Sequence, residues 1–147
     1  MPRKNIREMH GRPLLAYTIE AALGSCLFAR VVVSTDDAEI AEVARAEGAD
    51  VPFLRAADLA DDITPVSRAT IDVVDRLEAT GVTFREVCQL MPNCPLRTAD
   101  DVVASHRQLA DRPSEAQISV ARYGWQNPWW AMRRAPDGSL DPLFPDA

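Results

Sequence analysis

Three short polar segments, each directly after an apolar run, hold the side chains best suited to chemistry in this sequence. Segment 34–37 contains Asp36 and Asp37, whose carboxylates can bind a metal ion or can cap and begin a helix. Segment 55–65 opens with an arginine, and segment 91–98 carries another just before an expected helix. Since the first-turn N–H groups of a helix favour negative charge, the second arginine is well placed for an anion.

The apolar runs predict strands, and the longer periodic stretches between them predict helices. The run RVVVS is β-branched, as in strands that are buried on both faces. We expect strands over 30–34, 51–54, 86–91 and 116–122, and helices over 13–24, 37–47, 66–80 and 99–110. This alternation indicates βαβ units, and therefore an α/β fold with a mostly parallel sheet and helices on both faces.

Several details of these elements follow from the pattern. Leu15, Ile19 and Ala22 share one face of the first helix, and Ile71, Val74 and Leu77 are the expected inward face of the third. Asp36 is the expected cap of helix 37–47, which Gly48 ends, and Thr98 is a cap candidate for helix 99–110. From Arg134 onward, three prolines and one glycine without periodicity predict a loop.

The polar segments should share one edge of this sheet. Ligands of open α/β sheets bind at the carboxyl ends of the strands, which places 34–37, 55–65 and 91–98 together. The chain nevertheless opens with PRKNIREMHGRPLL, a lead-in to a helix, where such a fold normally begins with a strand. We therefore expect the first strand to be missing and the sheet to have a gap at its centre, with unpaired backbone on both sides.

Composition limits the class of protein. The 147 residues have a net charge of −6, which argues against a general nucleic-acid binder, although a few local cations can still hold a triphosphate. The three cysteines form no CxxC pair, which fits reduced thiols in the cytoplasm. No apolar run is long enough to cross a membrane, and the basic amino terminus lacks the apolar region of a signal peptide.

Four collinear segments resemble the acylneuraminate cytidylyltransferases, also called CMP-sialic acid synthetases. These segments are PRKNIREMHGRPLLAYTIEAAL, VVVSTDDAEIAEVA, RAADLADDIT and MPNCPLRTADDV. The resemblance implies a Rossmann-like nucleotidyltransferase sheet and transfer of CMP from CTP to an acidic nine-carbon sugar, with release of pyrophosphate. It also implies Mg²⁺ as cofactor and a homodimer, and the expected gap in the sheet adds a strand-exchanged oligomer as an alternative. No nucleic-acid or membrane partner is implied.

The resemblance also assigns nucleotide-binding residues. Lys4 and Asn5 match the K-N pair that closes the family's phosphate-binding loop, and Arg55 matches its nucleotide-contacting arginine. Asp62 and Thr64 match the D-x-T of the same segment as Arg55. The alternatives are a solvated basic terminus for Lys4, a surface ion pair with Asp58 for Arg55, and loop or capping roles for the D-x-T residues.

Three further assignments are more open. Arg97 matches the arginine of the P-L-R-T motif, where it contacts the ligand or ties the loop to backbone carbonyls. Asn93 offers an amide to the sugar where Met91 replaces the family's glutamine. Trp129, in a cluster of three tryptophans, stacks on a ligand or packs in a core or interface.

Departures from the family pattern qualify these expectations. The glycine- and serine-containing loop after strand one and the aspartate pair for magnesium are absent, so we name no catalytic residue and no metal ligand within the chain. We expect a nucleotide-binding core over 1–133, an irregular tail over 134–147, and weak or no activity from these residues alone. The alternatives are a non-catalytic nucleotide-binding or interaction domain, and a related transferase for another sugar.

Overall fold

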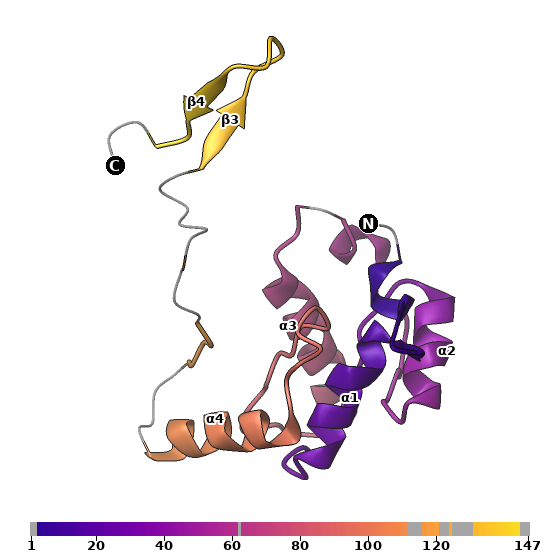
Figure 1. Ribbon diagram of the computed structural model, residues 1–147. Coiled ribbons are helices and arrows are strands. Elements are labelled where there is room, and N and C mark those ends of the chain that lie inside the picture. Colours follow the sequence, from indigo (N-terminus) through magenta and orange to yellow (C-terminus); the bar gives the residue numbers. More distant parts are fainter. Residues whose placement is uncertain (1–2, 62, 112–115, 121–123, 125–130, 145–147) are drawn as a thin grey trace. The chain divides into compact units, whose positions relative to one another are not determined.

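The computed structural model describes residues 3–61, 63–111, 116–120, 124 and 131–144. The chain divides into two compact units, Met1–Arg112 and Pro113–Ala147 (Figure 1). The first unit contains the 3₁₀ helix η1 (Lys4–Ile6), strands β1 (Glu8–Met9) and β2 (Arg12–Pro13), helices α1 (Leu14–Gly24) and α2 (Ala38–Ala46), the 3₁₀ helix η2 (Ala57–Leu59), and helices α3 (Val66–Glu78) and α4 (Ala99–Asp111). The second contains strands β3 (Met132–Arg134) and β4 (Leu140–Pro142). The fold is therefore mixed helix and strand.

All four expected helices are confirmed, with ends that differ by one or two residues. The buried face of α1 includes Leu15, Ile19 and Ala22, as the spacing predicts. In α3 the prediction for Ile71 was wrong, because this side chain is 52% exposed while Leu77 is buried. The buried residues of α3 are Ala69 and Leu77, eight positions apart on one face, and Ile71 lies about 200° round the helix from Ala69.

The start of α2 differs from the expectation by one residue. Asp37, not Asp36, is the N-cap, and its carboxylate accepts hydrogen bonds from the N–H groups of Glu39 and Ile40 at 2.8 and 3.2 Å. Asp37 takes this position because its own N–H donates to the Thr35 hydroxyl at 3.2 Å and its backbone is extended. Asp36 therefore does not cap this helix, and its carboxylate can pair with a residue elsewhere in the chain.

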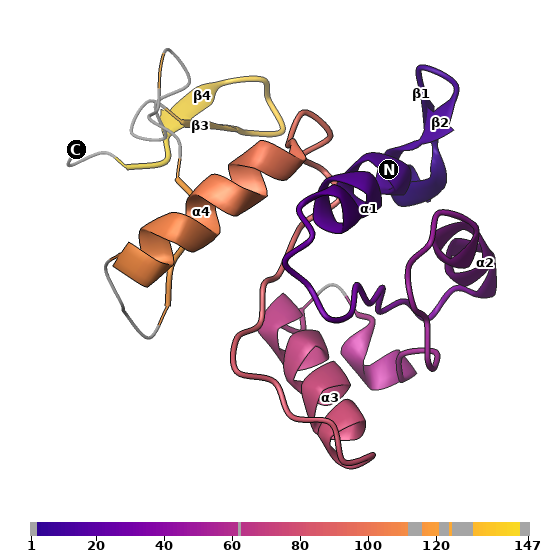
Figure 2. The same ribbon diagram turned by 90° about the horizontal axis from the view of Figure 1, so that it is seen from below.

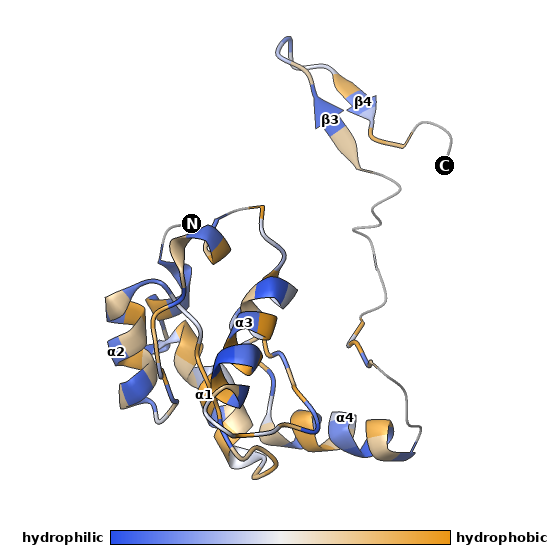
Figure 3. Ribbon diagram, turned by 180° about the vertical axis from the view of Figure 1, so that it is seen from behind, coloured by the Kyte–Doolittle hydropathy of each residue, from blue (hydrophilic) through white to orange (hydrophobic). Residues whose placement is uncertain are grey.

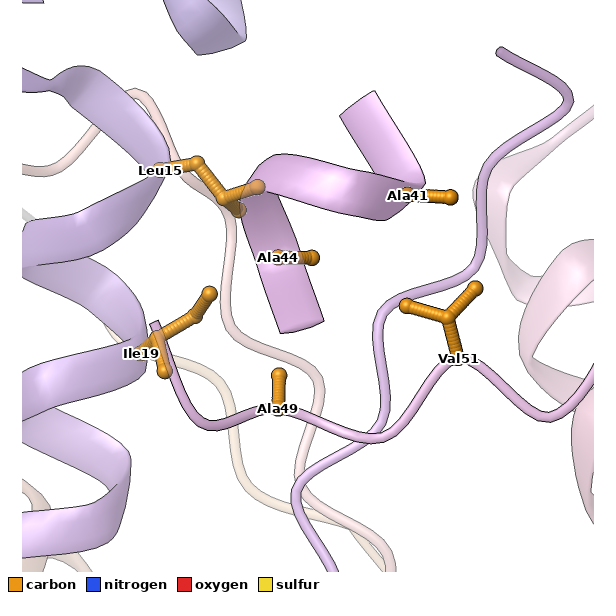
Figure 4. Packing of buried hydrophobic residues seen from close by; sticks show 6 residues of the cluster. All are labelled: Leu15, Ile19, Ala41, Ala44, Ala49 and Val51. Carbon is orange, nitrogen blue, oxygen red and sulfur yellow. The ribbon is translucent and has the colours of Figure 1, made fainter. Parts of the chain in front are cut away.

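A small apolar core joins α1, α2 and the segment after α2 (Figure 4). Leu15 and Ile19 of α1 pack with two alanines of α2, and Ala49 and Val51 complete the cluster. The alanines let the backbones approach closely, so few large side chains are needed. The left-handed Gly48, with φ of 91°, turns the chain from α2 back towards this core.

The expected strands 30–34 and 51–54 are reduced to one parallel bridge between Val32 and Asp50. The N–H of Val33 donates to the Asp50 carbonyl at 2.9 Å, and the N–H of Asp50 donates to the Val31 carbonyl at 2.8 Å. Pro52 holds the next donor position in this ladder and has no N–H, so regular pairing stops there. The parallel direction of this pairing was predicted, but the prediction of two full strands over 30–34 and 51–54 was wrong.

Segment 86–91 is extended but is not a strand, and Val87 is 56% exposed. The prediction of a buried strand was wrong because a strand exists only when a neighbour pairs with it, and none of the described residues does so. Side chains hold the segment instead: the Thr70 hydroxyl donates to the Gln89 amide oxygen at 2.9 Å, and His106 contacts Glu86 at 3.0 Å. Residues 116–120 are likewise not assigned to a strand.

The remaining strands form two short antiparallel hairpins. β1 and β2 are joined by His10 and Gly11, both at positive φ, so residues 3–9 do not form a central strand. β3 and β4 contradict the irregular tail expected from Arg134. A turn through Asp137 and Gly138 joins them, a signal that the sequence analysis overlooked. None of the described helices is long and apolar enough to cross a membrane.

Candidate functional site

A cleft of about 470 Å³ lies within the first unit, between the extended segments 30–36 and 84–93. Figure 2 shows the segment that joins α1 to α2 passing between α1, α2 and α3. The polar side chains at the cleft include Lys4 and Asn5 of η1, and four that stand at or near the carboxyl ends of the expected strands: Ser34, Asp36, Arg55 and Asn93. The structure thus brings together four of the sequence-predicted site residues, namely Lys4, Asn5, Arg55 and Asn93.

Within the part of the chain that the structure describes, three of these cleft side chains have buried polar atoms without a hydrogen-bond partner. They are Asn5 Oδ1, Ser34 Oγ and Arg55 Nε, an acceptor, a hydroxyl and a donor. Buried polar atoms are nearly always hydrogen-bonded, and leaving one unpaired costs about 1–3 kcal/mol. Each of these atoms is a position at which a bound ligand could supply the missing hydrogen-bond partner.

Lys4 is exposed at the start of the chain, in η1. Its neighbour Arg3 is engaged, donating to the Asp37 carboxylate at 3.1 Å and pairing with Glu39 at 2.5 Å. These contacts attach the amino-terminal segment to the start of α2. Within the described residues Lys4 has no carboxylate within ion-pair distance, so its ammonium group can meet an anion from solution.

Arg55 is held at the cleft by both its backbone and its side chain. Its N–H donates to the Thr35 carbonyl at 2.8 Å, which continues the contact between the two extended segments. Its guanidinium lies 3.6 Å from the Asp36 carboxylate, and the side chain is only 22% exposed. The ion-pair partner is therefore Asp36 and not Asp58, the alternative considered from the sequence.

The D-x-T loop forms its own closed turn. The Asp61 carboxylate accepts from the N–H groups of Thr64 and Ile63 at 2.5 and 3.0 Å. These bonds, that to Thr64 first, lower the pKa of Asp61. The Thr64 hydroxyl donates to the Asp58 carbonyl at 3.3 Å, and Thr64 is not among the residues that line the cleft. Asp62 lies outside the described residues.

Arg97 behaves as a loop-tying residue. Its guanidinium donates to the Met91 carbonyl at 3.3 Å, the structural alternative considered from the sequence. This bond fixes the turn that carries Asn93 at the cleft. Nearby, burial raises the pKa of the Cys88 thiol, against a smaller opposing effect of Arg97. Trp129 and the other two tryptophans lie outside the described residues.

The sequence analysis missed Ser34 as a site residue and placed Asp36 at a cap. Ser34 ends the β-branched run RVVVS, so its position at the carboxyl end of an expected strand could have identified it. As for a metal, the described residues contain no group of three or more histidine, cysteine, aspartate or glutamate side chains able to hold an ion. The described donor set therefore does not fit a protein-bound magnesium.

A family model described as Cytidylyltransferase matches residues 1–122. Since this match covers most of the 147 residues, the chain belongs to the cytidylyltransferase family. The match includes every residue that lines the cleft.

Individual relatives agree with this family. The CMP-N,N'-diacetyllegionaminic acid synthase of Legionella pneumophila is 42% identical over 102 residues, 69% of this chain and 44% of that protein. A pseudaminic acid cytidylyltransferase of Campylobacter jejuni is 42% identical over 123 residues, 84% of this chain and 53% of that protein. The N-acylneuraminate cytidylyltransferase of Escherichia coli is 32% identical over 100 residues, 68% of this chain and 23% of that protein. The chain spans about half the length of the first two relatives.

Proposed function

We propose that this chain is the nucleotide-binding part of an enzyme that joins CMP from CTP to a nonulosonic acid and releases pyrophosphate. The carrying observation is the cleft in which, among the described residues, Asn5, Ser34 and Arg55 leave buried polar atoms without a hydrogen-bond partner, beside Lys4, which has no ion-pair partner there. The proposal also draws on relatives whose names specify legionaminic, pseudaminic and N-acylneuraminic acids.

In this reaction a sugar hydroxyl attacks the α-phosphorus of CTP in line. The new bond joins the sugar oxygen to phosphorus, the bond to the β-phosphate bridging oxygen breaks, and the hydroxyl proton leaves with a base that this chain does not identify. Lys4 and Arg55 would bind phosphate oxygens and stabilise the charge that develops on the leaving pyrophosphate. Asn5 and Ser34 would orient the base or ribose, so that catalysis is largely positioning.

Magnesium remains part of the proposal as a partner of the triphosphate. Only isolated carboxylates such as Asp36 and Glu86 line the cleft, and Asp36 is already paired with Arg55. We also propose a mostly parallel Rossmann-like sheet, with which the parallel bridge at Val32 is compatible. We propose a cytoplasmic setting, with which the free thiols of Cys26, Cys88 and Cys94 are compatible. The proposed assembly is a homodimer or a strand-exchanged oligomer.

Isothermal titration of the chain with CTP, UTP, ATP and GTP in the presence of magnesium tests the proposal. We expect CTP to bind more tightly than the other three, because unpaired amide and guanidinium atoms can read the edge of a base. Binding of all four with equal affinity would contradict a cytidine site and support a general phosphate site. Binding of none would remove the nucleotide-binding role of the described cleft.

A non-catalytic nucleotide-binding or interaction domain is the second candidate, which the sequence analysis left open. Incubation with CTP, magnesium and each of the three nonulosonic acids, followed by pyrophosphate detection, separates the two. CTP binding without pyrophosphate release would support the binding domain, and release would establish the transferase.

A further inference from the structure

The short turn η1, which carries Lys4 and Asn5, has little to stabilise it from within. None of its residues is fully buried, and no side chain caps its start. Its two backbone hydrogen bonds, from Ile6 to the Arg3 carbonyl and from Arg7 to the Lys4 carbonyl, are both long at 3.3 Å. Hydrogen-bond geometry in a 3₁₀ helix is poorer than in an α-helix, so a single turn contributes little stability of its own. The position of Lys4 and Asn5 at the cleft therefore depends on contacts outside η1.

On its carboxyl side, η1 is anchored to α1 through the backbone. The N–H of Leu14 donates to the Arg7 carbonyl at 2.9 Å, and the Tyr17 hydroxyl donates to the Met9 carbonyl at 2.6 Å. These acceptors lie in the segment that follows η1, and neither contact involves a charged group. The amino-terminal side of the turn, where Lys4 lies, needs a separate anchor.

Arg3 supplies this anchor by contacting two carboxylates at the start of α2. Its Nη2 donates to the two carboxylate oxygens of Asp37 at 3.1 and 3.4 Å, and it lies 2.5 Å from the Glu39 carboxylate. Asp37 is itself fixed, because it caps α2 by accepting from the N–H groups of Glu39 and Ile40. We call these two contacts the Arg3 clamp. The clamp joins η1 to the end of a helix and not to a freely rotating side chain.

The backbone of Arg3 also indicates that outside contacts determine its conformation. Its φ is 54° and its ψ is 28°, in the left-handed region that a residue other than glycine adopts only at a cost. Such a conformation persists where the surrounding structure fixes it. The clamp does this, because it holds the side chain of the same residue.

We propose that Arg3 is a positioning residue for the nucleotide site, whose clamp on Asp37 and Glu39 holds Lys4 and Asn5 at the cleft. The charge of Arg3 is matched by the two carboxylates, so this residue acts through Lys4 and Asn5 and not as a further cation of the site. The effect on nucleotide binding rests on the proposed function, whereas the effect on η1 does not.

Two glutamates of α2 separate the clamp from a general effect of charge. Figure 3 shows hydrophilic positions among hydrophobic ones along α2, and the exposed Glu39 and Glu42 are among its hydrophilic residues. Glu42 pairs with Arg45 of the same helix at 2.6 Å. Loss of a negative charge near a phosphate site raises its affinity for an anion if charge alone matters. A loss of affinity in Glu39→Gln, but not in Glu42→Gln, is therefore specific to the clamp.

Amide hydrogen exchange of the full chain, without nucleotide, tests whether the clamp holds η1. We expect exchange at Ile6 and Arg7 to become at least about threefold faster in Arg3→Gln and in Glu39→Gln, because the turn opens more often. Glu42→Gln should leave both amides unchanged. Unchanged exchange at these amides in Arg3→Gln would overturn the proposal.

Titration of the same variants with CTP and magnesium tests whether the clamp serves the nucleotide site. We expect Arg3→Gln and Glu39→Gln to weaken binding about two- to tenfold, the size expected for exposed ion pairs, and Arg3→Lys to restore most of the affinity. In a Lys4→Gln background, Arg3→Gln should add little further loss, because residues that act through one another are not additive. Glu42→Gln should bind at least as tightly as the wild type.

Three results would count against this role of Arg3. Tighter CTP binding in Glu39→Gln, equal to that in Glu42→Gln, would overturn the proposal, since Arg3 would then act through charge alone. Fully additive losses from Arg3→Gln and Lys4→Gln would also overturn it, because Arg3 would then contact the nucleotide independently. A wild-type chain that binds no CTP would refute the proposed function and the nucleotide role of Arg3 together, and hydrogen exchange would then decide the clamp by itself.

Discussion

Asp36 and Arg55 form an ion pair at the polar end of the cleft. The carboxylate lies 3.6 Å from the guanidinium and partly neutralises it, while Arg55 Nε remains buried and unpaired. The arginine is therefore held in position by an ion pair and still has a donor for a ligand. The same residue would be the principal cation of the nucleotide site, together with Lys4.

Arg55→Gln should weaken CTP binding roughly 10- to 100-fold, because a hydrogen bond to a charged group contributes about 1.5–3 kcal/mol. Arg68→Gln is the matched control, since Arg68 is an exposed arginine of α3 that does not line the cleft. Calorimetric titration of both variants measures the difference. Equal losses in the two would show that only the net positive charge of the protein matters.

Asp37 should make the stability of α2 sensitive to acid. The pKa of its carboxyl is lowered, first by the N–H of Ile40 and then by the Arg3 guanidinium. The ionised form is thus favoured in the folded state, and its contribution is complete above the ordinary value of 3.8 and is lost as pH falls through the lowered value. Asp37→Ala should lower the melting temperature by several degrees at pH 7.

Asp37→Asn separates the two parts of this effect. The amide oxygen can still cap the helix but cannot titrate, so the difference in melting temperature between wild type and this variant should shrink as pH falls below about 4. Melting curves followed by circular dichroism at pH 7, 5 and 3 provide the measurement. If the difference in melting temperature stayed constant over this pH range, the effect of Asp37 on stability would come from its capping geometry and not from its charge.

At the scale of elements, helices and strands differ in how far their sequences determine them. α1, α2, α3 and α4 each carry their own backbone hydrogen bonds and apolar faces, and all four form where expected. The strands need partners elsewhere in the chain. Pro52 removes a donor from the bridge between the two expected strands, and segment 86–91 has no described backbone partner.

Pro52→Val should extend the parallel pairing between 31–35 and 50–55. The new N–H can donate to the Val33 carbonyl, so hydrogen exchange at residue 52 should be several-fold slower than at an exposed extended amide such as that of Val87. The global stability should change little. Without proline the unfolded chain is more flexible, which favours unfolding and offsets the stabilisation from the new hydrogen bond. Rapid exchange at residue 52 would show that something other than the missing donor ends the pairing.

At the scale of the whole molecule, we expect the first unit alone to bind the nucleotide. Every residue that lines the cleft lies within Met1–Arg112, although the family match continues to residue 122. The second unit, Pro113–Ala147, contains the β3–β4 hairpin. The two units can therefore be tested separately.

Residues 1–112 should bind CTP with an affinity within about threefold of the full chain, because the cleft is complete in that unit. Calorimetric titration of both proteins, with circular dichroism to confirm the four helices, measures this. A large loss in the shorter protein would mean that residues 113–147, which include Trp129, contribute to binding, in line with the ligand-stacking alternative for Trp129.

The sequence by itself predicted the four helices and the family, and it singled out Lys4, Asn5, Arg55 and Asn93, which the structure brings to one cleft. These follow from local periodicity and from short motifs, both of which are written along the chain. Only the tertiary structure decided that Arg55 pairs with Asp36, that Arg97 binds a backbone carbonyl, and that Thr64 stays within its own loop. It also decided that the expected strands are mostly unpaired, because backbone pairing in a sheet depends on hydrogen-bond partners that are distant in sequence.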